Sequence, residues 1–130
     1  TAGDQPKTYR AMRFQSIRMK DAPAEVPANF SLDEYFGNAW SVYKGEQTFD
    51  VEIEFTSDAA DLVTETVWHK TQQVKRHADG RATLTFRVDG LEEIVWWVLG
   101  WSGRAKVIQP TDLRKLVVEK LSQAIVLHQE

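Results

Sequence analysis

The chain of 130 residues contains no cysteine. Without thiols it can form no disulfide, no thiol nucleophile and no thiolate metal site. It also lacks a long apolar run and a pattern typical of an export signal, so we expect no membrane partner and no export of this segment. These absences fit a reducing environment, and we predict a cytoplasmic location.

Charge of one sign is not in large excess either. The formal net charge is -3, from 16 Lys and Arg against 19 Asp and Glu. This balance excludes a bulk basic protein that coats nucleic acid, although a local basic patch stays open. Hydrophobic residues make up 42% of the chain and charged residues 27%, so a folded domain with an appendage is expected rather than wholesale disorder.

Motifs for catalysis are missing as well. His69, His77 and His128 have no second histidine at ligand spacing, and we expect them at solvated turns or edges. The carboxylates of residues 50–54 alternate with apolar residues, as on the exposed face of any amphipathic strand. The serines lack a nucleophile elbow, and no glycine loop would cradle a phosphate. We therefore predict no catalytic residue, no metal, no cofactor and no enzymatic activity.

The opening stretch KTYRAMRFQSI carries arginines among strand-forming residues, and it predicts a strand over residues 8–17. Arg10 and Arg13 lie three residues apart, so a regular strand would place them on opposite faces unless a bulge or bend intervenes. Arg18 follows directly after the strand. Arginine is the side chain best suited to grip a phosphate with a planar fork. Spacing alone favours ordinary exposed residues, so a ligand role needs support from elsewhere.

A short helix is predicted over about residues 32–40. Ser31 and Glu34 are placed as a capping box, and Phe30 and Tyr35 as a hydrophobic staple. The segment VYKGEQ, residues 42–47, is then predicted to be a linker.

From residue 47 the pattern predicts a ferredoxin-like α+β sandwich, an antiparallel sheet with two helices on one face. The expected order is a strand over 47–55, a helix capped by Ser57 or Asp58, and a hairpin that turns at Asp79-Gly80. A helix over 91–100, a strand over 105–109 and a terminal helix after Pro110 complete it. The terminal helix is expected to turn five apolar residues inward: Leu113, Leu116, Val117, Leu121 and Ala124.

The stretch WWVLGW is the most unusual local feature. Trp97 and Trp101 lie near the edge of the apolar stripe of their helix and are expected in the core. Trp96 projects roughly opposite and is hard to bury in a small domain. We predict an interface role for Trp96, with packing against the terminal helix or the opening segment as alternatives.

Together these segments resemble a known family. RAMRFQSI resembles the R-x-F-R-L-x-R-I stretch that ends the WYL domain of bacterial transcriptional regulators, and PANFSLDEYFGNAW resembles the segment that leaves that domain. Residues 47–128 resemble its C-terminal extension, called WCX. VEIEF, an H-x-x-Q … D-G hairpin pattern, and WWVLGW followed by AKVIQPTDLR carry that second resemblance.

The resemblance implies a longer regulator with an N-terminal winged helix-turn-helix, a WYL domain on an Sm-like β-barrel, and then WCX. Residues 1–45 would be the C-terminal end of the truncated barrel plus a linker, and residues 46–130 the WCX domain. Ser16 stands where the family usually has another arginine. Ser102 stands where it usually has glycine, which leaves Gly103 to supply a flexible position.

The resemblance also implies a function. Arginines of the R-x-F-R stretch line the family's ligand surface, so Arg10, Arg13 and the nearby Arg18 would bind a nucleic-acid or nucleotide-like effector. We predict an effector-sensing, oligomerising and non-enzymatic region that modulates a DNA-binding domain absent here, and we expect a homo-oligomer. The alternatives are a pure dimerisation module and a ferredoxin-like small-molecule sensor that acts through residues 47–128 alone.

Overall fold

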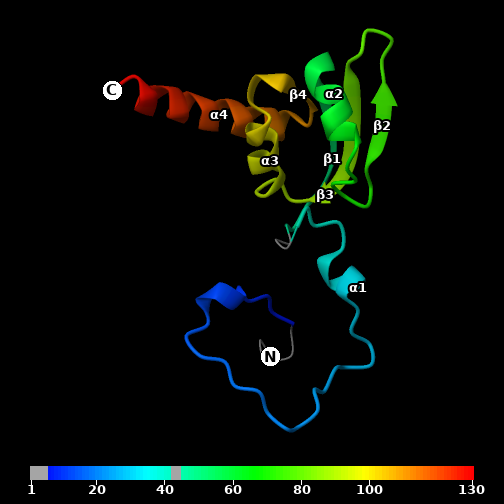
Figure 1. The fold of residues 1–130 in the computed structure, drawn as a ribbon, viewed down its shortest axis with the longest axis vertical. Helices are drawn as coiled ribbons and strands as arrows, with labels where there is room; N and C mark the ends of the chain where they lie inside the picture. The colour runs from blue at the N-terminus through cyan, green and yellow to red at the C-terminus, as the bar shows by residue number, and fades with distance from the viewer. Residues whose placement is uncertain (1–5, 42–44) are drawn as a thin grey trace. The chain divides into compact units, whose positions relative to one another are not determined.

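The computed structural model of the chain describes residues 6–41 and 45–130 (Figure 1). The chain forms two compact units, Thr1–Gly37 and Asn38–Glu130. The second unit therefore begins nearer the N-terminus than residue 46, the domain start predicted from the sequence.

The first unit contains a 3-10 turn, η2 (Ala11–Arg13), and a short helix, α1 (Leu32–Phe36). The predicted strand over residues 8–17 is wrong. No described segment pairs its backbone with these residues, and a strand requires a hydrogen-bonded neighbour. No described residue of this unit is buried.

Helix α1 begins as predicted and ends earlier. The Ser31 hydroxyl accepts a hydrogen bond from the Glu34 amide at 3.4 Å, and the rings of Phe30 and Tyr35 lie 6.3 Å apart as a staple. The helix ends at Gly37, which adopts a φ of 53°. Glycine takes a positive φ without a steric penalty, so it ends the helix after five residues.

The second unit is built on a four-stranded sheet. Its strands are β1 (Thr48–Phe55), β2 (Gln73–Arg76), β3 (Ala82–Asp89) and β4 (Ala105–Gln109), in the order β2-β3-β1-β4 with antiparallel neighbours. This is the strand order of a ferredoxin-like sandwich and confirms the predicted α+β fold. The β2–β3 hairpin turns at Asp79-Gly80 as predicted, with Gly80 at a φ of 92°.

Two helices cover one face of the sheet, α2 (Ser57–Thr64) and α3 (Ile94–Gly100) (Figure 1). They bury their apolar residues against the alternate residues of β1 and β3, so that Ile53, Phe55 and Leu84 are fully enclosed. The predicted cap of α2 is wrong by one residue. Thr56 is the N-cap, and its hydroxyl donates to the Asp58 carboxylate rather than accepting from the helix backbone.

A 3-10 turn, η3 (Ser102–Arg104), joins α3 to β4. The left-handed residue in this turn is Ser102, at a φ of 56°, and Gly103 is not needed for it. The expectation that Gly103 supplies the flexible position is therefore wrong.

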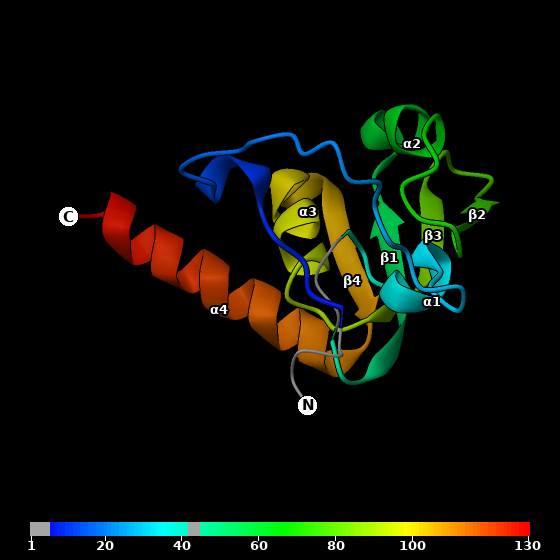
Figure 2. The same cartoon turned by 90° about the horizontal axis from the view of Figure 1, so that it is seen from below.

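The terminal helix α4 (Thr111–His128) continues beyond the body of its unit (Figures 1 and 2). Leu113 is fully buried, and Leu116 and Val117 pack against the core. Ala124 is half-buried, but Leu121 is exposed, so its predicted inward position is wrong. The sheet and α3 end before the helix does and leave its last turns uncovered.

Candidate functional site

The three predicted ligand-binding arginines lie in the first unit and are all exposed. Arg10 and Arg13 stand at the two ends of η2, where the Arg13 amide donates to the Arg10 carbonyl at 3.0 Å. Arg10 is the extended N-cap of this turn and Arg13 its last residue, so the turn brings the two backbones close without the bulge that a strand would need. Arg18 follows in irregular chain. Within residues 6–41 and 45–130, none of the three guanidinium groups forms an ion pair.

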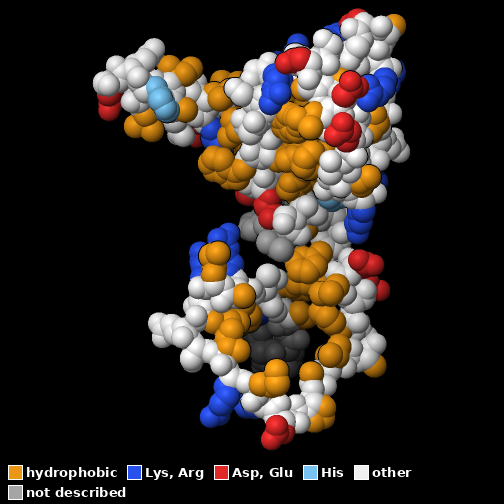
Figure 3. Space-filling model, viewed as in Figure 1, with side chains coloured by type: hydrophobic (Ala, Val, Ile, Leu, Met, Phe, Trp, Pro, Cys, Tyr) orange, Lys and Arg blue, Asp and Glu red, His pale blue; other side chains and the backbone are white. Residues whose placement is uncertain are grey.

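Aromatic rings flank these arginines. The rings of Tyr9 and Phe14 lie 6.2 Å apart across η2, and both side chains are exposed. Figure 3 shows Lys and Arg side chains gathered by this turn. Exposed cations beside exposed rings are the chemistry that single-stranded nucleic acid requires, since phosphates pair with the cations and bases stack on the rings.

In the second unit, the segment 38–41 is fastened to the end of β3. The Asn38 amide donates to Asp89 Oδ2 at 2.8 Å, and the Asp89 amide donates to the Asn38 carbonyl at 2.9 Å. The Ser41 amide donates to Glu93 Oε1 at 3.1 Å. The predicted linker over 42–47 lies partly outside the described residues, but the chain before it is anchored.

His69 holds the same segment from the other side. The Thr71 amide donates to His69 Nδ1 at 3.2 Å, so Nδ1 is the acceptor and the ring proton resides on Nε2. Nε2 lies 3.2 Å and 3.1 Å from the carbonyl oxygens of Asn38 and Ala39, to which it donates. The Thr71 hydroxyl accepts from the Arg87 amide at 2.8 Å and thereby ties this loop to β3.

Trp40 completes the attachment. Its ring stacks on His69 with an interplanar angle of 3°. It packs edge-on with Phe86 and in a tilted arrangement with Trp97, each with ring centroids 5.0 Å away. Trp97 also contacts Trp68, so the segment 38–41 adds a ring to the aromatic side of the core. The expectation of solvated turn or edge histidines is therefore wrong for His69, which is 6% exposed. The H-x-x-Q spacing of His69 and Gln72 forms a tight turn here: the Gln72 amide donates to the His69 carbonyl at 3.1 Å, and Gln72 Oε1 accepts from the Trp68 amide at 2.7 Å.

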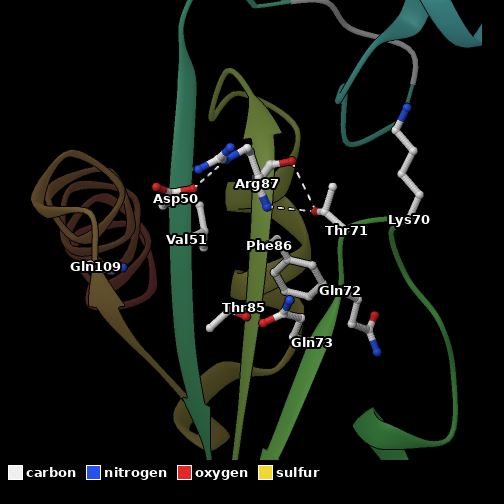
Figure 4. A pocket seen from close by; sticks show the side chains of 10 residues that line it. All are labelled: Asp50, Val51, Lys70, Thr71, Gln72, Gln73, Thr85, Phe86, Arg87 and Gln109. Atoms are coloured by element: carbon white, nitrogen blue, oxygen red, sulfur yellow. Dashed lines mark hydrogen bonds and ion pairs between the residues drawn. The ribbon is translucent and has the colours of Figure 1, made fainter.

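A groove of about 610 Å³ lies on the sheet face opposite the helices. Its lining comes from all four strands and the loop before β2: Asp50, Val51, Lys70, Thr71, Gln72, Gln73, Thr85, Phe86, Arg87 and Gln109. Figure 4 shows Arg87 turned toward Asp50 and Lys70 turned away from both. Sequence analysis did not find this site, because its members come from separate segments with no shared motif.

One ion pair organises the electrostatics of the groove. Arg87 Nε donates to Asp50 Oδ1 at 2.9 Å across the β1–β3 pair. This hydrogen bond and the charge of Arg87 lower the pKa of the Asp50 carboxyl below its ordinary value. Asp50 thus stays ionised near neutral pH and occupies the Nε edge of the Arg87 guanidinium, which lines the groove.

Trp96 lies outside the core, as its sequence position predicted, and is 62% exposed. Lys120 Nζ of α4 lies 4.3 Å from its ring centroid, a cation–π contact. Trp97 and Trp101 pack on the core as predicted.

Metal-ligating side chains do not cluster anywhere in the described part of the chain. In those same residues, no helix combines the length and apolarity that crossing a bilayer demands.

Comparison with known proteins identifies residues 47–125 as a WCX domain. These residues make up more than half of the 130-residue chain. The chain belongs to the WCX family. The match spans every strand of the sheet and most of α4, which confirms the predicted WCX resemblance. No curated protein matches the chain.

Proposed function

We propose that this chain is the effector-sensing and oligomerising region of a WYL-type transcriptional regulator, without enzymatic activity. WCX domains are associated with such regulators, so the family membership of residues 47–125 supports a regulatory role. The proposal places ligand recognition in the first unit and assembly in the second. DNA would be bound by a separate domain of the regulator.

The observation that carries the ligand site is the 3-10 turn with Arg10 and Arg13 at its ends. A single-stranded nucleic acid or nucleotide would place phosphates on these guanidinium groups and on Arg18, and a base on Tyr9 or Phe14. The cations are exposed, so binding would depend on released counterions and weaken with salt.

Transmission would run through the segment 38–41. Because Asn38, Trp40 and Ser41 are fastened to the second unit, a ligand that reorients the chain before Asn38 would act on an anchored point rather than on a free tether. Only a ligand that binds one arrangement more tightly than another can shift that equilibrium.

Fluorescence anisotropy of labelled single-stranded DNA tests the proposal on the full-length protein that contains these residues. The Arg10→Ala/Arg13→Ala variant should lose most of the affinity. The dependence of log K on log salt should become shallower by about 1.4, the contribution of two phosphate contacts on a single strand. The matched control is Lys75→Ala/Lys106→Ala, which removes the same charge from exposed strand positions of the second unit. Equal loss in both variants, or no binding by the parent, would contradict the site.

The sheet groove favours a second candidate function, a small-molecule sensor in the second unit. Its amide and hydroxyl groups offer donors and acceptors, and the free edge of Arg87 offers charge for an anionic group. Titration with adenosine monophosphate, followed by amide NMR shifts, separates the two candidates. Shifts at Thr71 and Arg87 would support the groove, whereas shifts at Arg10 and Arg13 would support the first unit.

A further inference from the structure

The end of α4 is apolar where nothing covers it. Val118, Leu121 and Ile125 are 63%, 44% and 56% exposed, and Val126 and Leu127 are exposed as well. The run Ala124–Leu127 is apolar around most of the helix circumference, a pattern typical of a helix that is buried on several sides. Figure 3 shows these apolar patches on the projecting helix. A helix that projects into water without a partner is marginally stable, so this end needs a surface to pack on.

The apolar residues form two separate stripes. Leu113, Val117 and Ala124 belong to the stripe that faces the body of the unit. Val118, Leu121 and Ile125 form a second stripe, with spacings of three and four residues. That alternation is the seam of a two-helix coiled coil, and it continues through Arg114 and His128 at its ends. We call Val118, Leu121 and Ile125 the outer seam.

We propose that the outer seam of α4 packs in antiparallel fashion against the outer seam of a second copy of this chain. The inference rests on the oligomeric part of the proposed function and names its surface. In this arrangement Leu121 lies close to the two-fold axis, and Val118 of one copy faces Ile125 of the other. Each contact occurs twice, as a closed dimer requires.

The shape of the helix surface supports this register. A shallow, mostly apolar hollow of about 400 Å³ lies on the outer side of α4 beside Val118, lined by Thr111, Arg114, Lys115, Val118 and Glu119. Along the axis of α4, the apolar run Ala124–Leu127 lies C-terminal to Leu121, and the hollow lies about as far N-terminal to it. In an antiparallel pair that crosses at Leu121, the apolar run of each helix therefore meets the hollow of the other.

The helix dipole favours the antiparallel direction, because it sets the positive N-terminal end of one α4 against the negative C-terminal end of the other. Parallel pairing would set Arg114 against Arg114 and Lys115 against Lys115, which is unfavourable.

Sedimentation equilibrium of the chain tests the proposal first. The wild type should have twice the mass of the 14.9 kDa chain. Ile125→Glu should weaken dimerisation at least a hundredfold, since it buries a charge in the seam. Gln123→Glu carries the same charge on the opposite side of the helix and should leave the dimer intact. Ile125 is exposed in the single chain, so the variant should keep the wild-type circular dichroism.

Cysteine cross-linking then tests the register, because the chain has no cysteine of its own. Leu121→Cys should form a disulfide-linked dimer, and a mixture of Val118→Cys and Ile125→Cys should form the mixed dimer. Neither of the latter two should link to itself, since antiparallel pairing separates identical residues by about 10 Å. Self-linking of both would indicate a parallel pair and overturn the proposal.

A monomeric wild type at 100 µM, or a dimer that Ile125→Glu does not weaken, would also overturn it. Loss of the dimer with DNA binding retained at Arg10 and Arg13 would refute this inference alone. If the longer protein is monomeric while its Ile125 is protected from labelling as a cysteine, the partner is another part of the same chain.

Discussion

The two units of this chain differ in how their apolar residues are used. In the first, Met12, Ile17 and Met19 are almost fully exposed, and no described residue is buried. In the second, β1 and β3 alternate buried and open positions, and two helices close over the buried side. Hydrophobic residues make up similar shares of the two units, 15 of 37 and 40 of 93, so hydrophobic content alone does not explain the difference.

Backbone pairing explains it. Each residue of β1 has a partner in β3, and its C-terminal half has partners in β4 as well. The opening segment has strand-forming residues and no described strand beside it. Apolar side chains gain free energy only when a neighbouring surface removes them from water, and the second unit contains such surfaces within itself.

The largest predicted difference between the units is in the stability lost when an isoleucine of each is shortened to alanine. Ile53→Ala should destabilise the second unit by about 2–5 kcal/mol, because the side chain is fully buried and leaves a cavity. Ile17→Ala, at 77% exposure, should change the free energy of unfolding by less than about 0.5 kcal/mol. Urea unfolding followed by tryptophan fluorescence measures both. A large effect of Ile17→Ala would show that the first unit packs on a surface in solution.

Replacing His69 should loosen the segment 38–41, where the first unit joins the second. His69→Ala removes the donor to the Asn38 and Ala39 carbonyls and should cost about 1–3 kcal/mol. Hydrogen exchange at the Thr71 amide should accelerate, since its acceptor is gone. Lys70→Ala changes the exposed neighbour and serves as the control. Unchanged exchange in His69→Ala would contradict the assignment of His69 Nδ1 as the acceptor of the Thr71 amide.

A smaller effect on stability is expected at Ser102, a residue of the second unit with an unfavourable left-handed backbone conformation. Ser102→Gly should stabilise by about 0.5–1 kcal/mol, since glycine relieves the left-handed conformation and loses part of that gain to greater freedom when unfolded. Ser122→Gly, in the regular helix α4, should have the opposite sign. Thermal unfolding measures both changes in stability. If both variants were destabilised, Ser102 would not have this left-handed backbone conformation.

The smallest effect concerns the Asp50–Arg87 pair, which is exposed on both sides. The folded pKa of Asp50 lies below its ordinary value, so the pair's contribution is present near neutral pH and is lost as the pH falls through that folded pKa, below about pH 4. Asp50→Asn should be slightly less stable than the wild type at pH 7, and the difference should shrink in acid. Urea midpoints at a series of pH values measure this. If the stability difference between the wild type and Asp50→Asn grew in acid, the pKa of Asp50 would not be lowered by folding.

Much of the second unit could be predicted from local patterns. The alternation in β1, the Asp79-Gly80 turn and the apolar stripe of α3 each depend on neighbours within a few residues. The hydrophobic staple of α1 was predictable for the same reason. The motif order also indicated the WCX family, which the comparison confirmed.

The sequence by itself therefore determined the element order, the antiparallel α+β sandwich and the exposure of Trp96, because periodicity records which side of an element faces the core. Only the tertiary structure decided that His69 is buried against Asn38 and Trp40, that the groove beside Arg87 exists, and that Leu121 is left uncovered. Each of these depends on segments far apart in the chain meeting or failing to meet. A local pattern predicts which residues seek a partner, but the packing of distant elements determines whether they find one.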